Sequence, residues 1–395
     1  MTAKTSEELR KRCLCAATKV VVKVGTNVLA SPGKGLDQKR IDSLSEQIAR
    51  LIQEGRQVVL VSSGAIGAGV AEIGLAGRPK LLPQLQAAAS VGQSKLMACY
   101  NASLSRFGLH AGQILLTRED LDSRDRYLNA SNTISALFEM KCVPVINEND
   151  TISTDEIRFG DNDLLAALVT HLIQADLLVL LTSVPGLGTR EPVPAAVRCV
   201  HEGLRFGREN LAVADVVDKV DDEVVALASG EISPSGMGGM ESKLQAARIA
   251  TEAGEAALIA DGTCPDILLR IMRGERVGTL FVPGAKRMRS YKRWLRFTSR
   301  PKGAIVVDEG ARKALCEKGK SLLPSGITGV EGEFGPGDLV RIKGPDGREF
   351  ARGLSNYSSA ETARIKGLKT SQIEAALGCK YYDEVVHRDN MALLE

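Results

Sequence analysis

Three segments of the chain place lysines or glycines where they could face a transferring phosphoryl group. Lys23 ends a β-branched run and precedes Gly25, so an ammonium group and backbone N–H groups could bind one anion. A glycine-rich loop, 62–69, follows another apolar run, and its small residues let the backbone approach a ligand. In the third segment, 236–243, Lys243 begins an expected helix, where its charge opposes the helix dipole unless an anion lies nearby. The pattern of a Walker A loop is absent.

Two clusters of acids and amides add groups that could hold magnesium, an ammonium group or a hydroxyl. Asn147-Glu148-Asn149-Asp150 follows an apolar run, and Gly160-Asp161-Asn162-Asp163 opens the apolar run 164–169. Each segment also has a plain structural interpretation as a helix N-cap, a turn, or a lysine solvated beside a turn. Taken together, the segments fit phosphoryl transfer, in which catalysis is mostly positioning and charge neutralisation.

The elements that must position these residues follow the order strand, helix, strand. The runs 19–24 and 57–61 predict strands, and apolar residues recur between them at helical spacing from Ile41 to Ile52. Further expected strands are 111–116, 143–146, 176–181 and 256–260. Repetition of this order predicts an α/β fold with a parallel sheet and helices on its faces. Ligands of such sheets bind beyond the carboxyl ends of the strands.

Composition bounds the class of protein. The 395 residues are 44% hydrophobic and 25% charged, which is ordinary for a globular protein with room for two domains. A net charge of +3 is too small to imply nucleic-acid or membrane binding by itself. The eight cysteines form no C-x-x-C pair or zinc spacing, which indicates reduced thiols. Without a signal peptide or a spanning run of about 20 apolar residues, a cytoplasmic protein is expected.

The character of the sequence changes after Leu280. Basic and aromatic residues are interleaved at 286–302, which indicates a linker or an interdomain strap. Beyond it, glycine-rich turns separate the short strand candidates 304–307 and 338–342, which predict a small, mostly β module. The expected division is a first domain, a basic linker, a second domain and a tail, at 1–283, 284–300, 301–385 and 386–395.

In this order and spacing, the polar segments resemble the amino acid kinase family, and within it the members that phosphorylate glutamate. The pair of clusters at 147–150 and 160–163 is the most discriminating part. The carboxy-terminal stretches 307–311 and 321–327 are similar to the PUA domain. The resemblance spans nearly the whole chain. It implies a three-layer sandwich around a mainly parallel sheet, followed by a PUA-like domain.

The resemblance also implies a role for each matched residue. Lys23 and Lys243 would contact the ATP phosphates and offset charge, while Asp161 and Asp163 would organise these lysines or magnesium. The implied glutamate-binding residues are Ser63, Gly64, Ala65, Asp150 and Asn162. The implied ATP-binding residues are Lys23, Gly25, Thr182, Ser183, Met237, Gly238, Gly239, Met240, Glu241, Ser242 and Lys243. No metal ligand is assigned.

The implied reaction is ATP plus L-glutamate giving L-glutamyl 5-phosphate and ADP, with Mg²⁺. It would be the first step of proline biosynthesis, with proline as inhibitor, in a homodimer or tetramer. Because the acceptor is already a carboxylate, no general base is needed. The obstacle is repulsion between two anions, about 4 kcal/mol for unit charges 4 Å apart at an effective dielectric near 20. Two lysines and magnesium would offset a term of that size.

The chain departs from the family pattern at three positions. Ser183 replaces a usual aspartate, Gly188 an aromatic residue and Met237 a threonine. We therefore expect nucleotide affinity or choice to differ. The alternatives within the family act on acetylglutamate, aspartate, uridylate or carbamate, and the 147–150 cluster and the PUA-like tail argue against them. The alternative of another class is an RNA-binding protein, since PUA-like modules often bind RNA and 286–302 mixes basic with aromatic residues.

Overall fold

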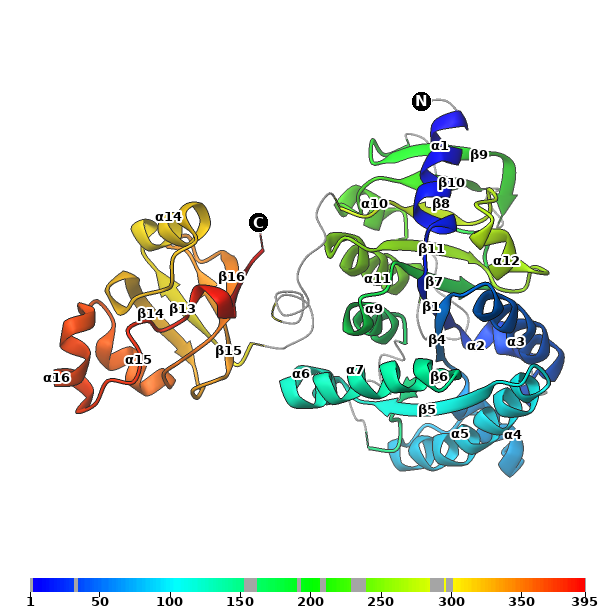
Figure 1. Ribbon diagram of the computed structural model, residues 1–395, viewed down its shortest axis with the longest axis horizontal. Helices are drawn as coiled ribbons and strands as arrows, with labels where there is room; N and C mark the ends of the chain where they lie inside the picture. Colours follow the sequence, from blue (N-terminus) through cyan, green and yellow to red (C-terminus); the bar gives the residue numbers. More distant parts are fainter. Residues whose placement is uncertain are drawn as a thin grey trace. The chain divides into compact units, whose positions relative to one another are not determined.

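The computed structural model describes residues 3–31, 35–152, 162–189, 193–206, 211–228, 239–284, 295 and 301–394. The chain divides into two compact units, Met1–Arg287 and Met288–Glu395 (Figure 1). Among the described residues, no helix has the length and apolar character needed to cross a membrane. All eight cysteines are free thiols.

In the described part of the first unit, ten strands form one sheet in the order β5-β6-β4-β1-β7-β11-β12-β10-β8, with β9 paired to β10. These strands are β1 (Lys19–Val24), β4 (Gln57–Ser62), β5 (His110–Leu116), β6 (Cys142–Glu148), β7 (Leu177–Thr182), β8 (Gly188–Thr189), β9 (Val197–Phe206), β10 (Leu211–Val217), β11 (Ala256–Asp261) and β12 (Thr279–Phe281). All neighbouring pairs from β5 to β11 are parallel, whereas β11 and β12 are antiparallel. The predicted mainly parallel sheet and its six expected strands are confirmed.

Helices cover both faces of this sheet (Figure 1). On one face lie α3 (Gln38–Gln53), α5 (Leu82–Ser105) and α12 (Ile267–Met272), and on the other lie α7 (Arg124–Glu139), α9 (Asn162–Ile173) and α11 (Met240–Glu252). Val20, Val22 and Val24 belong to the core under the first group. Because side chains alternate along a strand, Lys23 points to the opposite face, which α9 and α11 cover. The expected three layers are therefore present.

Helix α9 is the most deeply buried helix element of the site. Its residues 166–173 are all buried, and it contacts α7, α11 and β1. A helix that is apolar on all sides is stable only when other elements surround it. The helix predicted from the apolar run 164–169 is confirmed, and its first residue is Asn162. Gly160 and Asp161 lie outside the described residues.

Helix α4 (Ala65–Ile73) begins directly after β4 and packs against α5. Gly64 precedes it with a φ of 105°, a backbone conformation that glycine adopts without strain. At the crossing, a Cβ on Gly92 would lie 1.8 Å from the carbonyl oxygen of Ala65. Only glycine permits this approach, so α5 supports the start of α4 directly.

The remaining elements of the first unit are short. They are α1 (Ala3–Arg10), the π-helix η1 (Lys11–Cys15), α2 (Thr26–Leu29), β2 (Ala30–Ser31), β3 (Gly35–Leu36), α6 (Arg118–Asp122) and α10 (Asp222–Ala226). Arg10 is fully buried, and its guanidinium lies 2.6 Å from a carboxylate oxygen of Asp215. It also donates to the carbonyl oxygens of Val277 and Gly278. These bonds anchor the amino-terminal helix to the β10 and β12 side of the sheet.

The second unit contains a five-stranded sheet in the order β14-β13-β15-β16-β17. Its strands are β13 (Gly303–Val307), β14 (Ile327–Gly332), β15 (Leu339–Lys343), β16 (Glu349–Leu354) and β17 (Met391–Leu393). Its helices are α14 (Glu309–Lys318), α15 (Ser359–Ile365) and α16 (Ile373–Leu377). Short 3-10 turns are η3 (Pro324–Gly326), η4 (Thr370–Gln372) and η5 (Arg388–Asn390). The small, mostly β module and its two expected strands are confirmed. The stretch 386–395 includes β17, which pairs with β16. The basic stretch 284–300 lies outside the described residues except for 284 and 295.

Candidate active site

The candidate site lies at the carboxyl edge of the parallel strands. Strands β1, β4 and β7 are adjacent and parallel, so their last residues meet at one edge of the sheet. The Ser63 N–H extends this pairing by donating to the carbonyl oxygen of Val24 at 3.1 Å, and the Gly25 N–H donates to that of Leu181 at 3.3 Å. The amino-terminal ends of α9 and α11 supply the remaining groups. This is the position that an α/β sheet offers to a ligand.

A buried carboxylate joins the two predicted lysines. One oxygen of Asp163 lies 2.5 Å from Lys23 Nζ, and the other lies 3.0 Å from Lys243 Nζ. Ser242 also donates to the second oxygen at 2.8 Å. Asp163 is fully buried, and each lysine is only 6% exposed. Side chains from β1, α9 and α11 thus converge on one charged centre. From the sequence, this grouping could be predicted only through the family resemblance.

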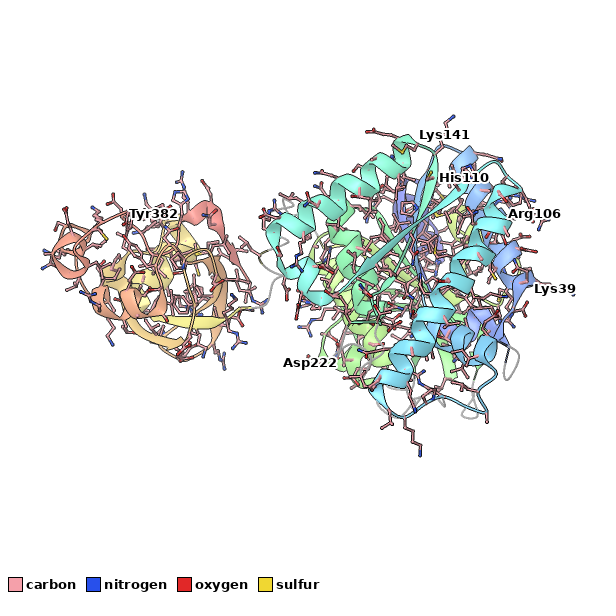
Figure 2. The ribbon with its side chains drawn as sticks, turned by 90° about the horizontal axis from the view of Figure 1, so that it is seen from below. Lys39, Arg106, His110, Lys141, Asp222 and Tyr382 are labelled. Atoms are coloured by element: carbon pink, nitrogen blue, oxygen red, sulfur yellow. The ribbon has the colours of Figure 1, made fainter. Side chains whose placement is uncertain are left out.

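The protonation state of Asp163 follows from its neighbours. Burial alone would raise the pKa of its carboxyl group, but the nearby ammonium groups of Lys23 and Lys243 outweigh burial and hold the pKa well below its usual range. Asp163 is therefore ionised at neutral pH. The carboxylate thus lies between two ammonium groups, a cluster of cations of the kind that binds phosphate. By contrast, Lys39 and Lys141 are exposed at the surface (Figure 2).

Next to the charged centre, amide side chains form a buried hydrogen-bonded series. Asn162 Nδ2 donates to Ser63 Oγ at 2.9 Å and to Asn147 Oδ1 at 3.0 Å. Asn147 Nδ2 donates to Gln93 Oε1 at 2.9 Å. We call Gln93, Asn147, Asn162 and Ser63 the amide relay. The relay links α5, β6, the start of α9 and the end of β4, so it joins four elements at this edge of the sheet.

The structure also shows the surroundings of other residues predicted for the site. Gly239 accepts hydrogen bonds through its carbonyl oxygen from Ser242 at 3.0 Å and Lys243 at 3.4 Å. Met240 is buried, whereas Glu241 and Ser183 are exposed. Residues 64, 65 and 182 lie at the carboxyl edge, where the Gly262 N–H donates to the Thr182 carbonyl oxygen. Gly188 pairs with Val213 in the sheet.

Asp150 lies in the turn after β6 and is half-buried, and its charge acts on Arg78. Burial lowers the pKa of Arg78, and Asp150 opposes that shift. Asp161, Met237 and Gly238 lie outside the described residues, so the structure places no contact of theirs.

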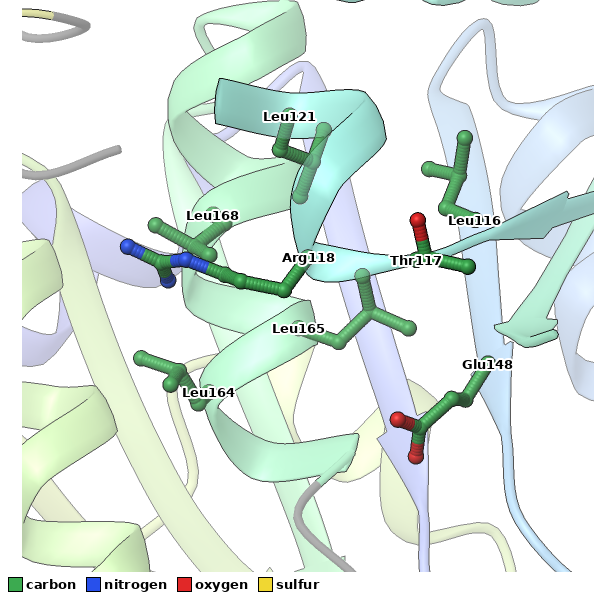
Figure 3. A pocket seen from close by; sticks show the side chains of 8 residues that line it. All are labelled: Leu116, Thr117, Arg118, Leu121, Glu148, Leu164, Leu165 and Leu168. Atoms are coloured by element: carbon green, nitrogen blue, oxygen red, sulfur yellow. The ribbon is translucent and has the colours of Figure 1, made fainter. Parts of the chain in front are cut away.

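A small pocket opens beside the relay, between the ends of β5 and β6 and the first turns of α9 (Figure 3). Its lining is mostly leucine, with the polar side chains of Thr117, Arg118 and Glu148 at its rim (Figure 3). The volume open to a water-sized molecule is about 40 Å³. That volume is enough for at least one water molecule.

Two residues on α5 that contact this edge were not predicted from the sequence. Gln93 belongs to the relay, and the Tyr100 hydroxyl lies 2.9 Å from Ser62 Oγ in the core. Burial raises the pKa of Tyr100 well above its usual range, so the phenol stays neutral. One feature of the sequence could have indicated these two residues. Gln93 and Tyr100 are seven residues apart and share one face of a helix rich in small residues.

Comparisons with known proteins show the family of the chain. Residues 18–261 match the model of the amino acid kinase family, and residues 303–377 match that of the PUA domain. The chain is 45% identical to a glutamate 5-kinase from Citrifermentans bemidjiense over 387 residues, which are 98% of this chain and 100% of that protein. It is 46% identical to a glutamate 5-kinase from Caldanaerobacter subterraneus, over 95% of this chain and 98% of that protein. A solved carbamate kinase from Giardia lamblia shares 16% identity at a TM-score of 0.45, over 69% of this chain and 100% of that one.

Proposed function

The chain belongs to the amino acid kinase family and, within it, to the glutamate 5-kinases, and we propose that it transfers the γ-phosphoryl group of ATP to the side-chain carboxylate of L-glutamate. The observation that carries the proposal is the position of Asp163. It bridges Lys23 and Lys243 and directly follows Asn162, which bonds to Ser63. These contacts support a cationic phosphate site next to an amide-lined acceptor site.

The chemistry asks for charge compensation and alignment. An oxygen of the substrate carboxylate attacks the γ-phosphorus, the bond from that phosphorus to the bridging oxygen of ADP breaks, and no proton has to be removed. Lys23 and Lys243 approach the phosphates from β1 and α11 and offset the charge that both anions bring. Asp163 keeps these two ammonium groups at fixed positions, since both of its oxygens are engaged. Backbone N–H groups of the residues that follow Gly25 and Gly239 are proposed as further donors, since the Gly25 N–H itself donates to the Leu181 carbonyl oxygen.

Magnesium is proposed to accompany ATP and to lower the repulsion between the two anions. Within the described ranges, no group of three or more His, Cys, Asp or Glu side chains is placed to hold a metal ion. Such an ion would be held mainly by phosphate oxygens and water, which is the usual mode for Mg²⁺. Asp161 and Asp163 are the acids of this chain proposed to face it.

Nucleotide and amino-acid sites are proposed residue by residue. The ATP site comprises Lys23, Gly25, Thr182, Ser183 and the stretch 237–243. The glutamate site comprises Ser63, Gly64, Ala65, Asp150 and Asn162. Exposed Ser183 lies at the end of β7 and would leave the adenine end less tightly held than the phosphate end.

An assay of ADP release with glutamate, aspartate and N-acetylglutamate side by side tests the activity. We expect release with glutamate to exceed that with the other two by at least about a hundredfold, as for a site that pairs buried polar groups with its substrate. Activity confined to aspartate or acetylglutamate would overturn the proposal.

We further propose that the reaction is the first step of proline biosynthesis, with proline as a feedback inhibitor, in a cytoplasmic homodimer or tetramer. The free thiols fit a reducing compartment. Initial rates measured with rising proline concentrations test the inhibition, and light scattering tests the assembly. Initial rates that do not change with proline at any glutamate concentration would rule out feedback inhibition by proline.

A further inference from the structure

The amide relay begins at a residue that is remote from the phosphate centre. Gln93 lies on α5, within the helix layer on one face of the sheet, and it is 8% exposed. Its Oε1 accepts from Asn147 Nδ2, and Asn147 Oδ1 accepts from Asn162 Nδ2. Through two hydrogen bonds, Gln93 is therefore connected to a proposed glutamate-binding residue.

One backbone group sets the direction of the whole relay. The N–H of Glu148 donates to Asn147 Oδ1 at 2.9 Å. A backbone N–H can only donate, so the atom of Asn147 that faces it must be the carbonyl oxygen. The other atom, Nδ2, then faces Gln93, which has to present its own oxygen. Asn162 has to present Nδ2 to Asn147, because Asn147 Oδ1 is an acceptor.

This direction determines what the relay offers to a substrate. Asn162 Oδ1 is buried and has no hydrogen-bond partner among the described residues. Ser63 Oγ accepts from Asn162, so the Ser63 hydroxyl proton remains available for donation. Asn162 therefore presents an acceptor, which suits an ammonium group, and Ser63 presents a donor, which suits a carboxylate. A reversed Asn162 amide would instead direct N–H groups at the ammonium group.

Helix α5 holds Gln93 firmly in place. The preceding residue, Gly92, is in close contact with the backbone of Ala65 and Gly69 on α4. About two turns further on, Tyr100 bonds to Ser62 at the end of β4. The helix thus contacts β4, α4 and, through Gln93, β6. These contacts fix the backbone that carries Gln93, so its side chain extends to Asn147 from a defined position.

We propose that Gln93 is a positioning residue that holds the Asn147 amide and, through it, keeps Asn162 Oδ1 directed at the α-ammonium group of the substrate. The inference rests on the proposed glutamate kinase activity. Gln93 touches neither the substrate nor the phosphates in this scheme. Its effect should therefore fall mainly on recognition of the ammonium group, which Asn162 Oδ1 faces in this scheme.

The test compares Gln93→Met, which removes the acceptor at similar length, with Gln93→Glu, which keeps an oxygen facing Asn147 Nδ2. The loss of one buried hydrogen bond predicts a rise of about tenfold in KM for glutamate in Gln93→Met. KM for ATP should change by less than about twofold, because the lysine centre is not part of the relay. Gln93→Glu should restore KM for glutamate to within about threefold of the unaltered chain.

Glutarate separates positioning from general support of the pocket, because it lacks the ammonium group of glutamate. Its inhibition constant should be nearly equal in the unaltered chain and in Gln93→Met. Gln84→Met on the exposed first turn of α5 is the matched control and should change nothing. If Gln93→Met does not fold, Asn147→Ala breaks the same relay and should also weaken glutamate but not glutarate.

Two results would overturn the inference: an unchanged KM for glutamate in a folded Gln93→Met protein, or equal weakening of glutamate and glutarate. An unaltered chain that releases no ADP with glutamate would instead overturn the proposed function. The two failures are therefore distinguishable.

Discussion

Asp163 is the residue on which the candidate site depends, because it is fully buried between two cations. Removing one member of a buried charged group leaves the others uncompensated, which costs about 3–5 kcal/mol. Apolar side chains of similar volume would often make a core as stable as this buried charged group does, or more stable. Its presence at the strand edge is explained by the proposed need for two fixed ammonium groups.

Lys243→Ala is expected to lower kcat about a hundredfold or more, because one of the two charges that offset the phosphoryl group is lost. KM for glutamate should change far less, since Lys243 bonds to Asp163 and Gly239 rather than to the relay. Steady-state kinetics of ADP release measures both constants. Lys39→Ala, which alters an exposed lysine on α3, is the control (Figure 2). A normal kcat in Lys243→Ala would remove that lysine from the mechanism.

Asp163→Asn is expected to destabilise the protein by about 3–5 kcal/mol at neutral pH. The folded pKa of Asp163 is depressed, so its stabilising contribution is complete above the unfolded pKa, near 3.9, and is lost as pH falls towards the folded pKa. The difference between the two proteins should therefore be constant from about pH 8 to pH 5 and shrink below about pH 4. Chemical unfolding followed by circular dichroism measures it.

The matched control for this change is Glu46→Gln, which breaks the exposed pair of Glu46 with Arg50 on α3. An exposed pair contributes about 0–1 kcal/mol, so little change is expected at any pH. A difference for Asp163→Asn that persists unchanged at pH 3 would contradict the depressed pKa of the Asp163 carboxyl.

At the scale of elements, the crossing of α4 and α5 positions the start of the proposed glutamate loop. Gly92→Ala would place a Cβ 1.8 Å from the Ala65 carbonyl oxygen and 2.3 Å from the Gly69 nitrogen. Both neighbours are backbone atoms, so the helices must separate. We expect a loss of about 1–3 kcal/mol and a raised KM for glutamate. Thermal unfolding and kinetics of the same sample test both effects.

Gly67→Ala provides the contrast on the same helix. Gly67 is exposed, and no heavy atom lies within 4 Å of the position its Cβ would take. Replacing a glycine inside a helix by alanine should stabilise α4 by about 0.5–1 kcal/mol. If Gly92→Ala and Gly67→Ala change the free energy of unfolding in the same direction, close packing at Gly92 does not determine the stability of the α4–α5 crossing.

Local pattern was sufficient for the elements with strong periodicity. In the β-branched run 19–24 and the apolar run 164–169, the residue types themselves favour one secondary structure. The sequence therefore predicts β1 and α9 correctly. The short strands β8 and β12 carry only two and three residues, and their pairing comes from tertiary contacts that no local pattern encodes. The relay could not be predicted from local pattern either, because Gln93 and Asn147 are 54 residues apart in the sequence.

At the scale of the whole molecule, the described site residues lie in one unit. Lys23, Ser63, Asn162 and Lys243 all belong to 1–287, and the second unit has its own core around Ile305, Phe350 and neighbouring apolar side chains. A unit with its own core can fold alone. We therefore expect the first unit to carry the proposed kinase reaction without side chains of the PUA-like unit.

We expect the fragment 1–287 to keep kcat and KM for glutamate within about threefold of the full chain, since the contacts of Asp163 with Lys23 and Lys243 and the hydrogen bonds of the relay lie inside it. The fragment 288–395 should fold, as judged by circular dichroism, and release no ADP. Mixing the two fragments should add nothing to the rate. A folded but inactive 1–287 fragment, recovered by adding 288–395, would show that the second unit completes the site, and the assignment of catalysis to the first unit alone would then be wrong.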